Sequence, residues 1–160
     1  MAARDRIVFA LDVGDLAEAR MWVDRIGTRV GWFKVGLELF SAAGPEVVHL
    51  ITSSGLKCFL DLKFHDIPNT VAGAVRSAVR LRAHMMTVHI SGGREMIRAA
   101  LTAGRQESEA LKIPRPKIIG VSVLTSLSQD DLSGLGVGRP LREHVGGLVE
   151  LACEEGIDGI

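Results

Sequence analysis

Two charged side chains stand two residues apart in an otherwise apolar stretch of the sequence. They are Asp61 and Lys63, within residues 57–70, which read KCFLDLKFHDIPNT. A β-strand turns every second side chain to the same face, so a strand here places both charges on one face. The other face is entirely apolar: Cys58, Leu60, Leu62 and Phe64. Because buried charges are costly unless they are paired, the spacing predicts side chains that serve chemistry rather than packing.

Two further charges extend this pair. Lys34 stands late in an earlier apolar run, and Asp66 follows Lys63 where the chain turns toward a predicted helix. If the four groups lie together, their charges alternate in sign, and each favours the ionised form of its neighbours. A lysine between carboxylates stays protonated, so it is a poor Schiff-base nucleophile but a good proton donor to a carbanion. The pattern predicts protonation at carbon by charges that are in place before the substrate binds.

Short apolar runs alternate with longer amphipathic stretches along the chain. The expected strands are residues 7–11, 32–35, 58–63, 85–89, 118–124 and a sixth that begins at residue 157. The expected helices are residues 16–26, 45–53, 69–82, 94–108 and 141–155, and three of them are followed by a glycine stop at Gly27, Gly55 or Gly156. This alternation predicts right-handed βαβ units and a parallel sheet.

Polar residues fall at the carboxyl ends of the expected strands. In chain order they are Asp12, Lys34, Asp61 with Lys63, His89 and Thr125. Parallel α/β folds hold their active sites at this edge of the sheet. Residues of the same parity are expected to face inward, and their apolar alternates to face the helices. The pattern predicts an α/β protein with the architecture of a (β/α)8 TIM barrel.

The length of the chain conflicts with a complete barrel. Such a barrel usually takes ~200–250 residues, whereas this chain has 160. The chain supplies five complete βα units and the opening of a sixth strand. We therefore expect residues 1–160 to form a single barrel domain that is C-terminally incomplete, equivalent to the N-terminal two-thirds of the fold.

The composition excludes several classes of function. The 19 basic and 19 acidic residues cancel, which argues against a nucleic-acid partner. No apolar run approaches the roughly 20 residues of a membrane span, and the charged first residues are unlike a signal peptide. Cys58 and Cys153 have neither a disulfide framework nor the spacing of a metal site. We expect a soluble, cytoplasmic, globular protein with reduced thiols.

Residues 61–70, DLKFHDIPNT, resemble the signature of the orotidine 5′-phosphate decarboxylase family. Four shorter pieces resemble the family in the same order: residues 9–13 (FALDV), 33–36 (FKVG), 88–93 (VHISGG) and 123–127 (VLTSL). The matches span nearly the whole chain, and the central motif is the most specific of them. The resemblance implies a barrel enzyme that removes CO₂ from orotidine 5′-monophosphate to give uridine 5′-monophosphate, with neither a metal nor an organic cofactor.

The resemblance also implies roles for the charged residues within one subunit. Lys63 is expected to protonate C6 of the pyrimidine, and Asp61 to lie near the departing carboxylate. Lys34 and Asp12 are expected to bind the ribose hydroxyls, with Lys34 also joining the charge network.

Other implied roles belong to a partner subunit or to loops. Family members are homodimers in which the residues matching Asp66, Ile67 and Thr70 enter the neighbouring subunit's site. Thr125 and Ser126 are expected in a loop that closes over the pyrimidine. The family grips the substrate phosphate with late barrel units, which are absent from these 160 residues. We therefore expect the chain alone to be a poor catalyst, because remote phosphate contacts supply binding energy used at the reacting carbon.

Simpler interpretations remain open for several of these residues. Asp61 and Lys63 can form a purely structural ion pair. Asp66 can serve as a helix N-cap, since a proline in the first helical turn needs no backbone donor. Asp12 can be a turn residue, and Thr125 can satisfy backbone groups at the end of a strand.

Two other functions also remain open. A related phosphosugar synthase or epimerase uses a similar barrel and an Asp-x-Lys-x-x-Asp strand but requires a divalent metal. His65 and His89 lack the compact spacing of a metal site, and Lys34 with residues 67–70 favours the decarboxylase. Alternatively, the chain is an inactive fragment that acts only by associating with another chain, since an uncovered sheet edge promotes association.

Overall fold

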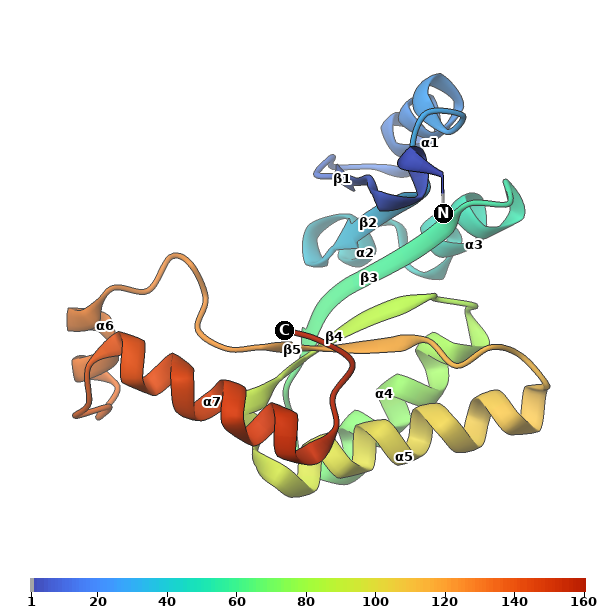
Figure 1. Cartoon of the computed structure of the whole chain (residues 1–160). Helices are drawn as coiled ribbons and strands as arrows, with labels where there is room; N and C mark the ends of the chain where they lie inside the picture. The colour runs from blue at the N-terminus through green and yellow to red at the C-terminus, as the bar shows by residue number, and fades with distance from the viewer. Residues whose placement is uncertain (1) are drawn as a thin grey trace.

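Five parallel strands follow one another across a single sheet (Figure 1). The computed structural model describes residues 2–160, and its strands lie in the order β1-β2-β3-β4-β5. Their bounds are Val8–Leu11 (β1), Trp32–Gly36 (β2), Lys57–Phe64 (β3), Met85–His89 (β4) and Lys117–Val121 (β5). Every neighbouring pair is parallel. Parallel strands in sequential order with helical connections form the wall of a (β/α) barrel, so the predicted fold class is confirmed.

The helices between β1 and β5 connect the strands and pack on one side of the sheet, whereas α6 lies away from it (Figure 1). Their bounds are Leu16–Ile26 (α1), Leu37–Ala43 (α2), Pro45–Ser53 (α3), Pro68–Arg80 (α4), Gly93–Leu111 (α5), Gln129–Gly134 (α6) and Leu141–Glu155 (α7), with short 3-10 helices at Ala3–Arg6 (η1) and Ile90–Gly92 (η2). The predictions for α1, α3 and α7 are confirmed to the residue, and those for α4 and α5 to within three residues. Within residues 2–160, no helix is long and apolar enough to cross a membrane.

The short helices α2 and α6 escape prediction for a physical reason. α2 spans 7 residues and α6 spans 6, which is too few turns to display a helical period. Gly44 separates α2 from α3 with a φ of 60°, a conformation that side chains other than glycine rarely adopt. The segment between β2 and β3 therefore holds two helices where the sequence pattern indicates only the second.

One face of the sheet is buried beneath the helices. Its most buried side chains are apolar and at most 1% exposed: Leu11, Phe33, Val35, Cys58, Leu60, Met86, Val88 and Ile118. The opposite face carries Lys34, Asp61 and Thr87 and is partly open, since Val8 is 44% exposed. The predicted alternation between inward-facing and helix-facing residues is confirmed for these strands, except beyond residue 61 of β3, where the register shifts.

The chain returns to the sheet after α7. Gly159 forms an isolated parallel bridge with Ile119, and its carbonyl accepts from the Gly120 amide at 2.8 Å. The Asp158 amide donates to the Ile118 carbonyl at 3.1 Å, while the Asp158 carboxylate binds Arg115. These residues therefore lie along the outer edge of β5, the position predicted for a sixth strand, although the pairing there is a single bridge.

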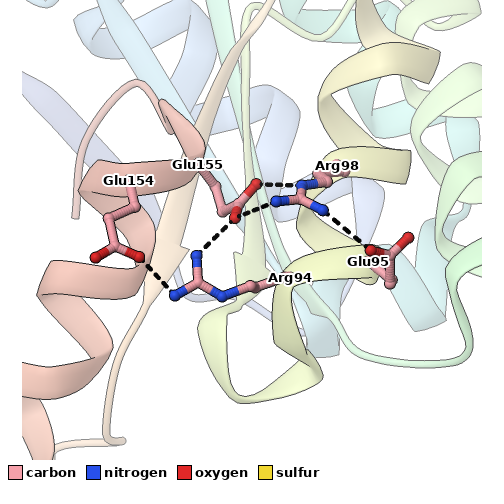
Figure 2. A network of polar contacts seen from close by, with 5 residues as sticks. All are labelled: Arg94, Glu95, Arg98, Glu154 and Glu155. Carbon is pink, nitrogen blue, oxygen red and sulfur yellow. Dashed lines mark hydrogen bonds and ion pairs between the residues drawn. The ribbon is translucent and has the colours of Figure 1, made fainter.

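Ion pairs and a small apolar cluster hold α7 against α5 (Figure 2). Glu155, at the end of α7, binds both Arg94 and Arg98 of α5. The buried apolar side chains of this cluster are Ile90, Ile97, Leu148 and Ala152. Figure 2 shows the charged groups bridging the two helices, so α7 is fixed by both polar and apolar contacts.

Candidate active site

Three charged side chains from two neighbouring strands meet at one edge of the sheet. The Lys63 Nζ atom lies 3.0 Å from both carboxylate oxygens of Asp61. The Lys34 Nζ atom, on β2, lies 3.9 Å from Asp61 Oδ2. The Asp61 side chain is only 14% exposed. A largely buried carboxylate is therefore shared by two ammonium groups, and each lysine partly offsets the cost of burying that carboxylate.

Asp12 extends this group toward solvent. It directly follows β1, and its Oδ1 atom accepts a hydrogen bond from Lys34 Nζ at 3.1 Å. The Asp12 side chain is 71% exposed, in contrast to Asp61. Lys34 thus spans a buried carboxylate and an open one. We refer below to Asp12, Lys34, Asp61 and Lys63 as the mouth cluster.

An irregularity in β3 sets the direction of the Lys63 side chain. Leu60 pairs with Met86, but the register resumes only at Phe64 with Val88, so residues 61–63 face the single residue between them on β4. Lys63 has a φ of 52°, in the left-handed region, which costs a non-glycine residue about 1–2 kcal/mol. The expectation of plain alternation through this strand is therefore wrong over its last residues. Bulges of this kind re-aim side chains beside functional sites.

The residue that faces the bulge is Thr87, which sequence reasoning does not single out. Its Oγ1 atom accepts from the Lys63 amide at 2.8 Å and donates to Asp61 Oδ1 at 3.0 Å. Thr87 is 4% exposed. The available signal is weak: a lone hydroxyl in the apolar run MMTVH, at the same parity as His89.

Asp66, Ile67 and Thr70 lie apart from the mouth cluster, at the exposed start of α4. Within residues 2–160, Asp66 forms no ion pair with either lysine of the cluster. Its Oδ1 atom accepts instead from the Ile67 amide at 2.6 Å. The interpretation of Asp66 as the helix N-cap is wrong, because α4 begins at Pro68 and Ile67 holds the N-cap position. The expected array of four alternating charges therefore contains only three of its members, Lys34, Asp61 and Lys63, within one chain.

Two histidines lie beside the cluster. The rings of His65 and His89 are 5.1 Å apart. Burial lowers the pKa of His89 below its ordinary value of 6.5, and the nearby His65 and Lys63 lower it further. Among residues 2–160, no three His, Cys, Asp or Glu side chains lie close enough to share a metal ion. Cys58, which burial gives a pKa of about 12, is an inert core thiol rather than a nucleophile.

Thr125 and Ser126 form an exposed turn between β5 and α6. The prediction of a strand through residue 124 is wrong, because β5 ends at Val121. The turn is closed by a hydrogen bond from the Leu127 amide to the Leu124 carbonyl at 3.0 Å. The two hydroxyl residues are therefore carried on a loop that leaves the carboxyl edge of the sheet.

Comparison with known proteins assigns this arrangement to a family. A family model described as "Orotidine 5'-phosphate decarboxylase / HUMPS family" matches residues 5–160. The chain belongs to this family. The matched range contains every member of the mouth cluster, the start of α4 and the Thr125–Ser126 turn, so the resemblance noted in the sequence extends over the whole candidate site.

Curated proteins that are similar in sequence to this chain carry the name of the same family. Orotidine 5′-phosphate decarboxylases of Moorella thermoacetica and Syntrophotalea carbinolica are 50% and 48% identical over 161 and 158 residues. The alignments cover 100% and 99% of this chain, but 64% and 65% of the relatives. The chain therefore spans slightly less than two-thirds of the length of these curated relatives.

Solved structures of similar proteins share the fold. The crystal structure of orotidine 5′-phosphate decarboxylase from Lactobacillus acidophilus has a TM-score of 0.89 at 36% identity, over 98% of this chain and 70% of that chain. An uncharacterized conserved protein from Geobacillus kaustophilus has a TM-score of 0.90 at 37% identity, over 95% and 71% of the two chains. At these TM-scores, this chain and the two solved structures share the same backbone fold over the aligned residues.

Proposed function

We propose that the protein decarboxylates orotidine 5′-monophosphate to uridine 5′-monophosphate in pyrimidine nucleotide biosynthesis. The observation that carries the proposal is the ammonium group of Lys63, held 3.0 Å from Asp61 at the carboxyl edge of a family-typical sheet. Family membership gives the class of reaction, and the mouth cluster supplies groups that suit it.

The proposed chemistry is a loss of CO₂ followed by a proton transfer. The bond between C6 of the pyrimidine and the carboxylate carbon breaks, and its electron pair stays on C6. Lys63 then gives an N–H proton to C6 and is reprotonated from water. The ammonium groups of Lys63 and Lys34 are fixed before the substrate arrives, so they stabilise the developing negative charge with little reorganisation.

Asp61 and Asp12 have different proposed tasks. Asp61 holds the Lys63 ammonium group in position, and it lies where the departing substrate carboxylate would be close to a second negative charge. Such repulsion accelerates the reaction only if it is relieved in the transition state. Asp12 is exposed and bound to Lys34, which suits hydrogen bonding by both to ribose hydroxyls.

The donor set around Asp61 argues for chemistry without a metal. Both carboxylate oxygens already accept from Lys63, and Oδ1 also accepts from Thr87. A divalent cation placed on this carboxylate would sit beside two ammonium groups and be repelled by them. We therefore propose the decarboxylase rather than a metal-dependent phosphosugar synthase or epimerase.

We also propose that the working form is a cytoplasmic homodimer. Ile67 is 67% exposed, and it stands beside Asp66 and Thr70, which are also exposed. A partner that covers Ile67 would carry Asp66 toward the partner's mouth cluster. Sedimentation of Ile67→Glu beside Leu135→Glu tests this, because Leu135, at the end of α6, is 71% exposed and lies outside the expected partner-contacting segment. Only Ile67→Glu is expected to weaken the dimer, and equal sedimentation of both variants with the parent would contradict the proposal.

The catalytic proposal is tested by following the loss of orotidine 5′-monophosphate absorbance. Because the chain spans 64% of its Moorella relative, two proteins are assayed: the chain itself, and a chimera that continues it with the C-terminal part of that relative. In the chimera, Lys63→Ala is expected to lower kcat by about 10²–10⁴-fold. Lys57→Ala, at the opposite end of the same strand, is the matched control and is expected to leave kcat unchanged.

Each alternative function has its own outcome in this assay. Loss of activity in a chelator favours the metal-dependent phosphosugar enzyme. Activity that survives Lys63→Ala shows that another group donates the proton. An inactive chimera that binds other chains points to a role in association alone.

A further inference from the structure

Thr87 has an unusual place among the polar residues of the core. Within residues 2–160, only Thr87 and Ser108 are polar residues in the buried class. The Ser108 hydroxyl has no hydrogen-bond partner, whereas the Thr87 hydroxyl has two, and both belong to residues of the mouth cluster. A buried hydroxyl tied to two chemically active residues calls for an explanation beyond packing.

The two hydrogen bonds of Thr87 stand opposite the bulge in β3. Three β3 residues, 61–63, face Thr87 alone, so the regular ladder supplies no partner for the Lys63 amide at this point. The Thr87 hydroxyl replaces the missing backbone acceptor and takes the Lys63 N–H at 2.8 Å. The same hydroxyl has one proton to give, and it gives this proton to Asp61 Oδ1 at 3.0 Å.

This arrangement joins the backbone of one residue to the side chain of another. The amide hydrogen bond holds Lys63 in its left-handed conformation, with a φ of 52°. The carboxylate hydrogen bond fixes the rotamer of Asp61, which in turn receives Lys63 Nζ at 3.0 Å. Removing the hydroxyl leaves a buried N–H and a largely buried carboxylate oxygen without their partner, and both relax toward other geometries.

We propose that Thr87 is a positioning residue that aims the Lys63 ammonium group and the Asp61 carboxylate at the reacting carbon. The inference rests on the proposed decarboxylation, and it assigns to Thr87 no contact with the substrate. Because a displacement of about 1 Å at a reacting group can cost on the order of 10²-fold in rate, a hydroxyl that sets this aim affects kcat more than substrate binding.

The test compares two substitutions of similar size. Thr87→Val replaces the hydroxyl with a methyl group, and Thr87→Ser keeps the hydroxyl and removes the methyl group. In the active protein we expect Thr87→Val to lower kcat by roughly 10–100-fold with KM within about 3-fold, and Thr87→Ser to keep kcat within about 3-fold. Ile118→Val, a truncation in the helix-facing core of β5, is the control and is expected to reduce stability without changing kcat.

A second measurement follows the hydrogen bond of the Lys63 amide. Hydrogen exchange of the Lys63 amide is expected to be at least about 10-fold faster in Thr87→Val than in the parent chain, and unchanged in Thr87→Ser. Parent-like kcat and parent-like exchange in Thr87→Val would overturn the proposal. An equal fall in kcat for Thr87→Val and Thr87→Ser, in step with stability, would also overturn it, because that result describes packing alone.

The two proposals fail in different ways. If neither the chain nor the chimera decarboxylates orotidine 5′-monophosphate, the proposed function is wrong. The exchange measurement then still decides the role of Thr87. Faster exchange of Lys63 in Thr87→Val but not in Thr87→Ser supports a hydroxyl that holds Lys63 in place, and unchanged exchange in both variants refutes it.

Discussion

The mouth cluster on the sheet and the ion pairs between α5 and α7 are both networks of charged groups, but they are built from different side chains. At the sheet edge, two lysines share Asp61. Between the helices, two arginines share Glu155 (Figure 2). Glu155 is even less exposed than Asp61, with 5% of its side chain accessible against 14%. Burial of a shared carboxylate therefore does not distinguish a reactive site from a structural one.

The use of hydrogen-bond donors does distinguish them. All three nitrogen atoms of Arg98 are engaged, two by Glu155 and one by Glu95. The forked, planar guanidinium suits such a closed arrangement. Lys63, by contrast, has three N–H donors, and both hydrogen bonds of its Nζ go to Asp61. Among residues 2–160 the third donor of Lys63 has no partner and can approach a substrate, and the side chain is 38% exposed.

The network between α5 and α7 also stabilises the charged forms of its own members. Hydrogen bonds from Arg98 and Arg94 hold the pKa of Glu155 below its ordinary value. Hydrogen bonds to Glu154 and Glu155 raise the pKa of Arg94 further above the ordinary arginine value. Near neutral pH, Glu155 therefore stays ionised and Arg94 stays protonated. A site that transfers a proton needs a donor that can release it, and a lysine ammonium group can do so whereas an arginine guanidinium cannot.

The largest expected effect comes from exchanging the two kinds of cation. Lys63→Arg places a guanidinium, which cannot be deprotonated in proteins, beside Asp61. We expect kcat of the active protein to fall by about 10²–10⁴-fold, since the proton donor is lost while the positive charge remains. Arg98→Lys loses the fork that grips Glu155, so the melting temperature should fall by a few degrees with kcat unchanged.

Kinetics and thermal melts of both exchange variants check this prediction. Unchanged activity of Lys63→Arg would contradict this difference between the two networks, because positive charge alone would then suffice in the mouth cluster. A loss of activity in Arg98→Lys that remains folded would contradict it as well.

Neutralising the shared carboxylate of each network is expected to have the next largest effect. Asp61→Asn removes the anion between Lys34 and Lys63 and leaves the two ammonium groups repelling each other. We expect kcat to fall by roughly 10²–10³-fold, comparable to the loss of one preorganised electrostatic contact in other active sites. Glu155→Gln releases α7 from α5 and should lower the melting temperature without a change in kcat per folded molecule. A fall in kcat for Glu155→Gln that matches Asp61→Asn would mean that α7 also shapes the mouth.

How far the sequence predicts this molecule depends on the range of the interactions. Local periodicity predicts the strands and the exact bounds of α1, α3 and α7, because the side-chain pattern of a strand or helix is set within a few residues. It also predicts that Lys34, Asp61 and Lys63 lie at the carboxyl edge of the sheet. The sixth-strand position at residue 157 was likewise predicted, since Ile157 follows the Gly156 stop of the preceding helix.

The bulge and its partner were not predictable in this way. Thr87 is 26 residues from Asp61, and nothing in either segment states that three residues of one strand will face one residue of the next. The N-cap assignment failed at Asp66 because Ile67, an atypical cap, precedes the first-turn Pro68 instead. The pairing of α5 with α7 also escaped prediction, since Arg94 and Glu154 lie 60 residues apart. Register and helix docking are tertiary properties, and a single sequence carries little record of them.

The smallest expected effect separates the two networks by pH. His89, beside the mouth cluster, has a pKa lowered first by burial and then by His65 and Lys63. Its neutral form is therefore favoured by folding, and the free energy of unfolding falls as the pH drops from 6.5 toward the lowered folded value. Glu155 has a lowered pKa because Arg98 and Arg94 donate to it. Its contribution is fully present above 4.5 and is lost as the pH falls below that value toward the folded pKa.

Urea unfolding across both pH windows, with His89→Asn and Glu155→Gln as the variants, measures this separation. His89→Asn should flatten the dependence just below pH 6.5 and leave the acid limb intact, while Glu155→Gln should flatten only the limb below pH 4.5. His84, at the other end of the sheet, also has a pKa lowered by burial and by Lys57, so it supplies the dependence that remains near pH 6.5 in His89→Asn. If Glu155→Gln instead changes the pH dependence just below pH 6.5, the two networks are coupled through the sheet. The mouth cluster and the ion pairs between α5 and α7 would then not be separable into a reactive and a structural network.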